Sequence, residues 1–458
     1  MDLQFKEASE LERKMGIEIY LTTQDGIGGR IRTLLSDFIV REVLRSGLRA
    51  EVSPKWPSGS LPGKGSFLLC TLIKKGIDTL TAARELARAL GIPNGLISFA
   101  GLKDAKAITA QFITIRGAKP GQLELLSFRN MLVVPVEFTT KPVNPSDLIA
   151  NEFGILIRDI GMPSTDALVR LEAILGDLKE LGGMPNFFGH QRFGTHRPVT
   201  HLIGRELVLG RVKEAVELLL TYIGPGEGAR AREARSYLAD TWDLKGFLEL
   251  LPKGMFYERE VARHLIKRPR DYHGAIRKLP IKLRKLFVQA YQAYLFNRFL
   301  SSRAKEGLPL SEPLPGDWVV LLDEHGLPHR AVRASRSNLG TLRGLIKAGR
   351  ASLALPIPGF RQEGSGGRQG EIEEAILEEE GISPSDFKVK AMPELSSPGQ
   401  LRPALASFRL LEDPRVTGDE LNPGRRAVFL SFRLPRGSYA TCLLREVIKP
   451  RDLIKSGF

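Results

Sequence analysis

The residue best placed for chemistry is Asp104, which lies in a turn that begins at Gly101 and leads into the run 111–116. The alternation of polar and apolar residues in this run predicts a half-buried strand, and a helix predicted over 78–90 precedes the turn. Two rigid elements therefore fix the position of the carboxylate. A solvated turn is the usual reading of a Lys-Asp pair, but a carboxylate held in this way can also serve as a nucleophile.

A second group of functional side chains lies in 185–194, PNFFGHQRFG, where three phenylalanines accompany an asparagine, a glutamine and an arginine. Flat rings beside amide and guanidinium donors can sandwich an unstacked base and read its edge. Packing in the core explains one or two of the phenylalanines as well. His190, His196 and His201 have neither the spacing nor the carboxylate partners of a metal site, so we expect no bound metal.

Two further segments could contribute to a site. Arg30 and Arg32 alternate out of a predicted strand over 30–34, which precedes another over 38–43, although an ordinary surface strand gives the same pattern. Near the other end, 437–441 (GSYAT) predicts a turn into a helix whose open N-terminus can hold an anion.

The charge balance favours a polyanionic partner. The 458 residues carry a formal net charge of +15, with 67 lysines and arginines against 52 acidic residues. Each phosphate that a basic protein neutralises releases counterions, so an excess of this size points to nucleic acid, with simple solubility as the alternative.

Other patterns exclude several classes of protein. The two cysteines, Cys70 and Cys442, lie in apolar runs and give neither a disulfide framework nor a zinc motif, which fits a reducing cytoplasm. The N-terminal residues are charged, and no run of 18 apolar residues occurs, so we expect no signal peptide and no membrane span. A Walker loop and a GxGxxG turn ahead of a helix are absent, and no nucleotide cofactor is expected.

Strands interleave with helices over the first two hundred residues, which predicts an α+β fold. Helices dominate from about residue 205 to 303, a β-rich unit follows at 313–357, and alternating strands return at 404–411 and 427–435. The β-rich ends thus bracket a mostly helical middle. A large insertion into one sheet and a simple string of three domains both explain this order.

Four blocks, taken together, resemble the TruD family of pseudouridine synthases. They are GLKDAKAITAQ, PNFFGHQRFG, AYQAYLFNRFLSSR and FRLPRGSYATCLLREVIK, and they run in the family's order from residue 101 to residue 449. The resemblance implies an isomerase that converts uridine to pseudouridine in RNA, most often tRNA, without a cofactor.

The resemblance also implies a fold and a division of the chain. A pseudouridine synthase core of mixed, largely antiparallel sheet with flanking helices would carry an inserted, mostly helical TRUD domain. We expect residues 1–204 and 396–458 to form the catalytic core and residues 205–395 the insertion.

By position in the family's motifs, Asp104 matches the catalytic aspartate and Arg32 the basic residue that pairs with it. An adjacent guanidinium favours the ionised form that a nucleophilic carboxylate needs. Five further residues match family positions near the substrate: Phe38, Glu42, Asn186, Phe188 and Phe432. We expect Phe188 to stack on a flipped-out uracil and Asn186 to hold nearby polar groups.

Three motifs depart from the family pattern, at 35–38, 150–153 and 399–402, which concerns local loops and RNA contacts rather than the aspartate. Two other functions compete with the isomerase. One is an inactive RNA-binding factor of the same fold, which the presence of Asp104, Arg32 and Phe188 disfavours. The other is a base-excising glycosidase with Glu42 as a second carboxylate, for which no motif speaks.

Overall fold

A computed structural model describes residues 5–458. Its main feature is a nine-stranded mixed sheet in the order β13-β15-β6-β1-β4-β2-β5, in which β14 pairs with β15 and β3 pairs with β4. The strands are β1 (Phe38–Leu44), β2 (Phe67–Lys75), β3 (Ile97–Phe99), β4 (Ile108–Arg116), β5 (Met131–Thr139), β6 (Leu148–Ile160), β13 (Arg409–Leu410), β14 (Arg415–Gly418) and β15 (Arg426–Pro435). Only β1 and β4 run parallel, so the predicted mixed, largely antiparallel sheet is confirmed.

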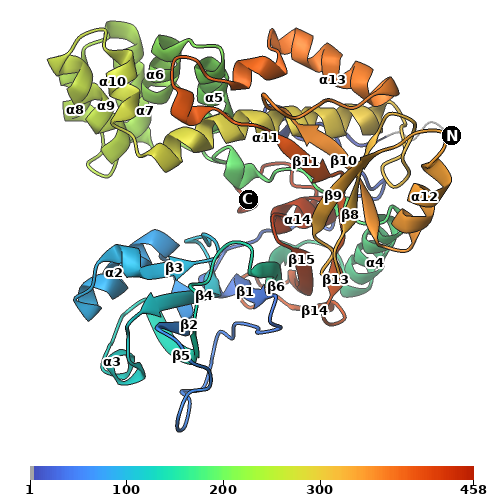
Figure 1. Ribbon diagram of the computed structural model, residues 1–458, viewed down its shortest axis with the longest axis horizontal. Coiled ribbons are helices and arrows are strands. Elements are labelled where there is room, and N and C mark those ends of the chain that lie inside the picture. Colours follow the sequence, from blue (N-terminus) through green and yellow to red (C-terminus); the bar gives the residue numbers. More distant parts are fainter. Residues whose placement is uncertain (1–4) are drawn as a thin grey trace.

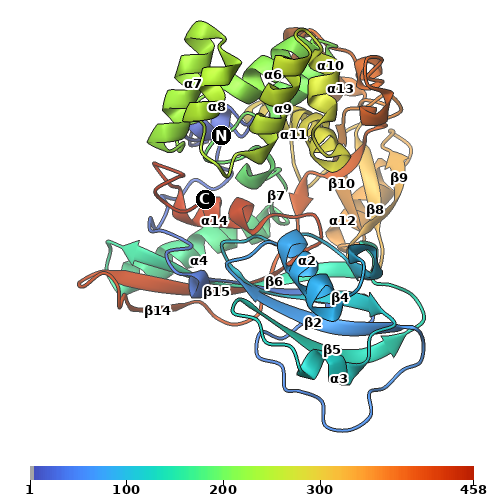
Figure 2. The same ribbon diagram turned by 90° about the vertical axis from the view of Figure 1, so that its left-hand side faces the viewer.

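The sheet draws on both ends of the chain. Its strands β1 to β6 precede residue 161, and β13 to β15 follow residue 408. The long strand β15 pairs antiparallel with β6 along most of its length, so the last strand of the chain sits inside the sheet. The helices α2 (Thr79–Leu90), α3 (Pro120–Glu124), α4 (Ser164–Glu180) and α14 (Ala440–Ile448) lie on its faces, as Figures 1 and 2 show.

The expected helical middle is present between these two sets of strands. Its helices are α5 (Thr200–Val208), α6 (Val212–Thr221), α7 (Ala229–Thr241), α8 (Leu244–Leu250), α9 (Phe256–Lys267), α10 (Tyr272–Arg277) and α11 (Ile281–Lys305). Figure 1 shows α6 to α10 grouped away from the large sheet, with the long α11 leading back from them. The chain thus leaves the large sheet, builds a helical insert and returns.

A smaller sheet follows the helices, in the order β11-β10-β8-β9. Its elements are β8 (Trp318–Leu322), β9 (Pro328–Arg333), α12 (Leu339–Lys347), β10 (Ala351–Ile357), α13 (Gly367–Glu380) and β11 (Gln400–Pro403). The pair β7 (Met184–Pro185) and β12 (Leu405–Ala406) forms the remaining ladder, and α1 (Glu10–Arg13) is the first helix. The sequence predicted neither α5 nor α12. We propose 205–395 as the inserted TRUD domain, although residue 205 falls inside α5.

The helix before Asp104 forms for the predicted reason. The Asp78 side chain caps α2 by accepting hydrogen bonds from the backbone N–H groups of Leu80 (2.9 Å) and Thr81 (3.0 Å). Gly91 then ends the helix at φ 66°, a left-handed conformation that glycine adopts without strain. The expectation of a helix over 78–90 followed by a strand over 111–116 is confirmed, but this strand is buried on both faces rather than half-buried, because its polar residues Gln111 and Thr114 are also enclosed.

The predicted strand over 30–34 is wrong. Only Arg30 forms an isolated bridge, to Arg158, and Arg32 adopts the left-handed conformation at φ 59°. The buried Asp37 carboxylate accepts from the backbone N–H of Leu34 at 2.7 Å, which closes a 3₁₀ turn over Leu35–Asp37.

Within residues 5–458, no helix combines the length and the apolar character that crossing a membrane requires.

Candidate active site

Asp104 lies in a cavity of about 170 Å³ that distant segments of the chain build together. The segments contribute Arg32 and Phe38, residues 102–104, Asn151 and Phe153, Gln191, and residues 438–441. The last of these is the turn that opens α14. The structure therefore brings the turn at Asp104, the segment before β1, strand β6, the PNFFGHQRFG block and the GSYAT turn to one place.

The guanidinium of Arg32 is the charged partner of Asp104. Its Nη2 lies 3.0 Å from Asp104 Oδ2, and the side chain of Arg32 is 7% exposed whereas that of Asp104 is 48% exposed. Burial lowers the pKa of Arg32 from its ordinary value, and Asp104 opposes that shift. The aspartate thus faces the cavity while its cation stays behind it.

Two contacts hold the Arg32 side chain in place. Its Nη1 donates to the carbonyl oxygen of Gly457 at 3.1 Å, and its guanidinium lies 4.1 Å from the centroid of the Phe38 ring. Phe38 begins β1 and is 2% exposed. Phe38 therefore supports Arg32 from below and also lines the cavity.

The backbone of the Asp104 turn is fixed by a buried lysine. Lys74 at the end of β2 donates from Nζ to the carbonyl oxygens of Asp104 (2.8 Å), Lys103 (3.2 Å) and Ile77 (2.8 Å). No carboxylate is among these acceptors, and Lys74 is 0% exposed. Burial lowers its pKa to about 8. The Lys74 ammonium thus contacts the backbone of Asp104 from the buried side of the turn.

Glu42 positions the same turn rather than facing the cavity. Its Oε1 lies 2.7 Å from Lys103 Nζ, and its Oε2 accepts from the backbone N–H of Phe112 at 2.8 Å. Glu42 is 0% exposed. The backbone N–H of Lys103 also donates to Thr79 Oγ1 at 3.0 Å, which ties the turn to the start of α2.

Phe432 supports the cavity from the core and does not touch it. Its ring stacks on Phe153 with 5.2 Å between centroids, and it is 0% exposed. Phe153 lines the cavity and meets Phe38 edge-on at 6.3 Å. Phe38 and Phe153 therefore form the apolar floor of the cavity, and Phe432 packs behind it.

Asn186 and Phe188 lie behind the cavity wall. Asn186 donates from Nδ2 to the carbonyl oxygen of Pro403 (3.0 Å) and accepts at Oδ1 from Arg402 (2.7 Å). Phe188 is 8% exposed, with the Arg402 guanidinium 4.2 Å from its ring centroid and Tyr439 edge-on to it. Neither residue lines the cavity around Asp104, whereas Tyr439 does.

Several cavity residues were not anticipated from the sequence. Tyr439, Asn151, Gln191 and Thr441 line the cavity, and Thr441 donates from Oγ1 to Gln191 Oε1 at 3.1 Å. Gln191 belongs to a block already singled out and Tyr439 to a turn already noted, but spacing along the chain does not reveal which side chains face Asp104. The buried Asn151 Oδ1 has no partner among residues 5–458, which leaves an acceptor at the cavity.

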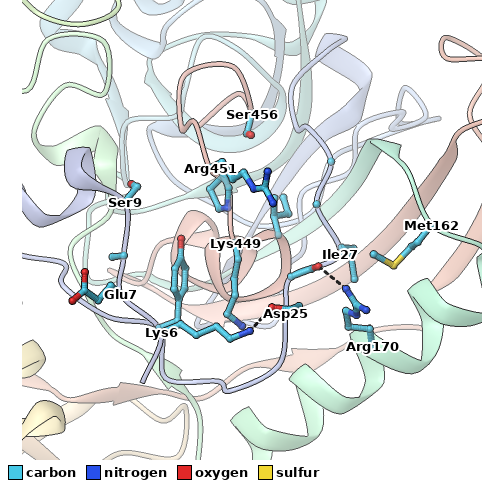
Figure 3. A pocket seen from close by; sticks show the side chains of 17 residues that line it. Lys6, Glu7, Ser9, Asp25, Ile27, Met162, Arg170, Lys449, Arg451 and Ser456 are labelled. Carbon is cyan, nitrogen blue, oxygen red and sulfur yellow. Dashed lines mark hydrogen bonds and ion pairs between the residues drawn. The ribbon is translucent and has the colours of Figure 1, made fainter. Parts of the chain in front are cut away.

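A larger hollow, of about 810 Å³, lies around Lys449 (Figure 3) and does not contain Asp104. Lys6 pairs there with Asp25, and Arg170 donates to the carbonyl oxygen of Gly26 at 3.3 Å. These cations are held by protein oxygens. None of the site residues expected from the sequence lies in this hollow.

Comparisons with known proteins agree with this geometry. The family described as tRNA pseudouridine synthase D (TruD) matches residues 14–447. A protein from Methanosarcina acetivorans described as "Probable tRNA pseudouridine synthase D" is 38% identical over 452 residues, which are 98% of each chain. One from Pyrococcus abyssi with the same description is 35% identical over 432 residues, 94% of this chain and 98% of its own.

A solved structure is similar over nearly the whole chain. A crystal structure from Methanosarcina mazei, described as "Putative tRNA pseudouridine synthase D (TruD)", superimposes with a TM-score of 0.80 at 35% identity, and the match covers 98% of this chain and 99% of that one. The fold and the matches define a tRNA pseudouridine synthase, which is an isomerase. Within that class, the chain belongs to the TruD family.

Proposed function

We propose that Asp104 is the nucleophile with which this isomerase turns a uridine of tRNA into pseudouridine. The observation that carries the proposal is the pairing of a half-exposed carboxylate with a nearly buried guanidinium inside a cavity. Such a carboxylate can reach a ligand, while Arg32 sets its orientation and complements its charge.

The reaction is balanced without an external reagent. The bond between N1 of uracil and C1′ of the ribose breaks, the base turns, and a bond between C5 and C1′ forms. C5 loses a proton and N1 gains one, so that nothing is oxidised or reduced. The Asp104 carboxylate would attack C1′ or C6, or assist the departure of uracil.

The base must leave its stack to enter the cavity, which costs a few kcal/mol. Tyr439 takes the stacking role that the sequence suggested for Phe188, because Tyr439 lines the cavity and Phe188 supports it from behind. Asn151 and Gln191 supply amide groups for the polar edge of uracil. Asn186 would then have a structural role, because its side chain links β11 to Ser438 at the cavity by hydrogen bonds.

The partner we propose is tRNA, bound in part through the excess of 15 positive charges, and the setting is the cytoplasm. The test is incubation with transcribed tRNAs, followed by mapping of pseudouridine as carbodiimide-dependent stops in primer extension. New stops that depend on Asp104 support the proposal. RNA binding without any new stop contradicts it, and release of free uracil indicates a glycosidase instead.

A further inference from the structure

Two arginines beside the active-site cavity lack a carboxylate partner. The guanidinium of Arg402 lies 4.2 Å and that of Arg192 5.5 Å from the centroid of the same ring, Phe188. Neither forms an ion pair with any residue in 5–458. Burial lowers the pKa of Arg402 to about 10, and the charge of Arg192 adds to that shift. The wall of the cavity thus holds two guanidinium groups that no carboxylate of the described residues compensates.

The buried arginines of the chain all pair with carboxylates, and they are Arg158, Arg235, Arg303 and Arg445. Arg303 pairs with Asp317 at 2.8 Å, and Arg445 pairs with Glu12 at 2.7 Å. Arg192 and Arg402 are half-buried and lie against the same ring, without a carboxylate from residues 5–458 between them. Two guanidinium groups so close together repel each other, and an anionic ligand would compensate both charges.

The hydrogen bonds that the two arginines make leave donors free. Arg402 donates from Nε to the Asn186 carbonyl oxygen (2.8 Å) and from Nη2 to the Gly437 carbonyl oxygen (3.0 Å). Arg192 donates only from Nη2, to the Tyr439 hydroxyl at 3.2 Å. Among residues 5–458, the Nη1 groups of both have no acceptor. Each arginine therefore has a donor group available to a ligand.

Both arginines lie next to the cavity that contains Asp104. Arg402 contacts Gly437 and Arg192 contacts Tyr439, which begin the turn whose residues 438–441 line the cavity. The turn opens α14, whose first N–H groups have no side-chain cap. An anion held here would sit next to a base in the cavity, and the helix N-terminus would favour its charge.

We propose that Arg192 and Arg402 bind a phosphodiester group of the RNA strand that flanks the target uridine. This inference rests on the proposed function, since it takes RNA as the ligand. Planar guanidinium forks match phosphate oxygens, and every nucleotide next to the flipped uridine brings one such group. Holding the backbone beside the cavity fixes the ribose, which must stay in place while the base turns.

The test combines protein variants with neutral phosphates in the RNA. A synthetic fragment of a transcribed tRNA that the protein modifies is made with single methylphosphonate linkages, one at each position around the modified uridine. Affinity is measured for the wild-type protein and for Arg192→Gln, whose side chain makes a single hydrogen bond and whose loss is least disruptive. Arg402→Lys is the second variant, because it keeps the charge and loses the fork.

We expect one linkage at which the methylphosphonate lowers affinity through the loss of a contact with the two arginines. This methylphosphonate weakens binding to the wild-type protein about tenfold and weakens binding to Arg192→Gln by clearly less, because only the contact with Arg402 remains there. The slope of log Kd against log salt also falls by about 0.7 in Arg192→Gln. Arg425→Gln is the matched control, since Arg425 pairs with Asp159 at 3.0 Å outside the cavity, and it should retain the full methylphosphonate effect.

Equal losses in the wild-type protein and in Arg192→Gln at every linkage would overturn the inference and leave the arginines a purely structural role. These measurements report affinity and not turnover. If the wild-type protein produces no pseudouridine in any tRNA, the proposed function fails by itself, and the same methylphosphonate series in a tRNA fragment that the protein binds still shows whether one phosphate depends on Arg192.

Discussion

Arg32 and Asp104 are 72 positions apart in the chain, and their side chains meet at 3.0 Å with the cation almost buried and the carboxylate half exposed. A second nitrogen of the same guanidinium binds the carbonyl oxygen of Gly457. The pair therefore depends on three separate segments, and changes in each segment have distinct consequences.

Replacing Arg32 should affect turnover more than binding. Arg32→Lys keeps a positive charge but cannot bridge Asp104 and the Gly457 carbonyl oxygen at once, so we expect kcat to fall about tenfold with the affinity for tRNA within threefold. Arg32→Ala should lower kcat further. Single-turnover rates and Kd for the same tRNA check this, and a selective loss of affinity would make Arg32 a phosphate contact.

A substitution at Gly457 tests whether the hydrogen bond from Arg32 to its carbonyl oxygen matters for turnover. Gly457 adopts φ +83°, and a Cβ there would lie 2.0 Å from the Ile31 carbonyl oxygen, so Gly457→Ala must displace the segment before Arg32. We expect a fall in kcat of about tenfold with KM unchanged. Gly28→Ala is the control, because Gly28 has φ +69° but open space around its Cβ position. Equal effects of the two substitutions would assign the loss to backbone strain alone.

Glu42 should matter for stability because it is the buried partner of Lys103. Glu42→Gln leaves the Lys103 ammonium without its carboxylate, and we expect the free energy of unfolding to fall by about 3 kcal/mol. The exposed pair of Arg13 and Glu7 provides a control, since Glu7→Gln should cost less than about 1 kcal/mol. Urea unfolding measures both, and similar costs would show that Glu42 does not anchor the turn.

Lys74 predicts how stability depends on pH. Burial lowers its pKa from 10.5 to about 8, so that the unfolded chain binds this proton more tightly than the folded chain does. Between pH 8 and pH 10.5 the unfolded state therefore carries more protons than the folded state, and the contribution of Lys74 to the free energy of unfolding rises with pH. The difference in this free energy between the wild-type protein and Lys74→Met should therefore grow from pH 8 to pH 10. A constant difference would contradict the lowered pKa.

Local patterns in the sequence were sufficient for much of the fold. The cap at Asp78, the stop at Gly91 and the alternation in 111–116 act within one element, and the structure confirms the helix and the strand that they predict. The segment 30–34 failed because its conformation depends on contacts far away in the chain. Arg30 meets Arg158, and Arg32 meets Gly457 and Asp104, which no local pattern encodes.

The sequence motifs indicated which segments form the site, but not which of their side chains line the cavity. The family motifs predict that Arg32 pairs with Asp104, and the structure has the two side chains 3.0 Å apart. The motifs did not separate Phe188, which is enclosed, from Tyr439, which lines the cavity. Phe188 is kept out of the cavity lining because it packs against Phe296 and Arg402, which come from other elements.

The most direct test of the account is the rate of pseudouridine formation by Asp104→Asn on a tRNA that the wild-type protein modifies. Asparagine keeps the size of the side chain and removes the negative charge that a nucleophile needs. We expect no pseudouridine from this variant, with its affinity for the tRNA within about tenfold of the wild-type value. Pseudouridine formation at a rate near that of the wild-type protein would contradict the central role of Asp104.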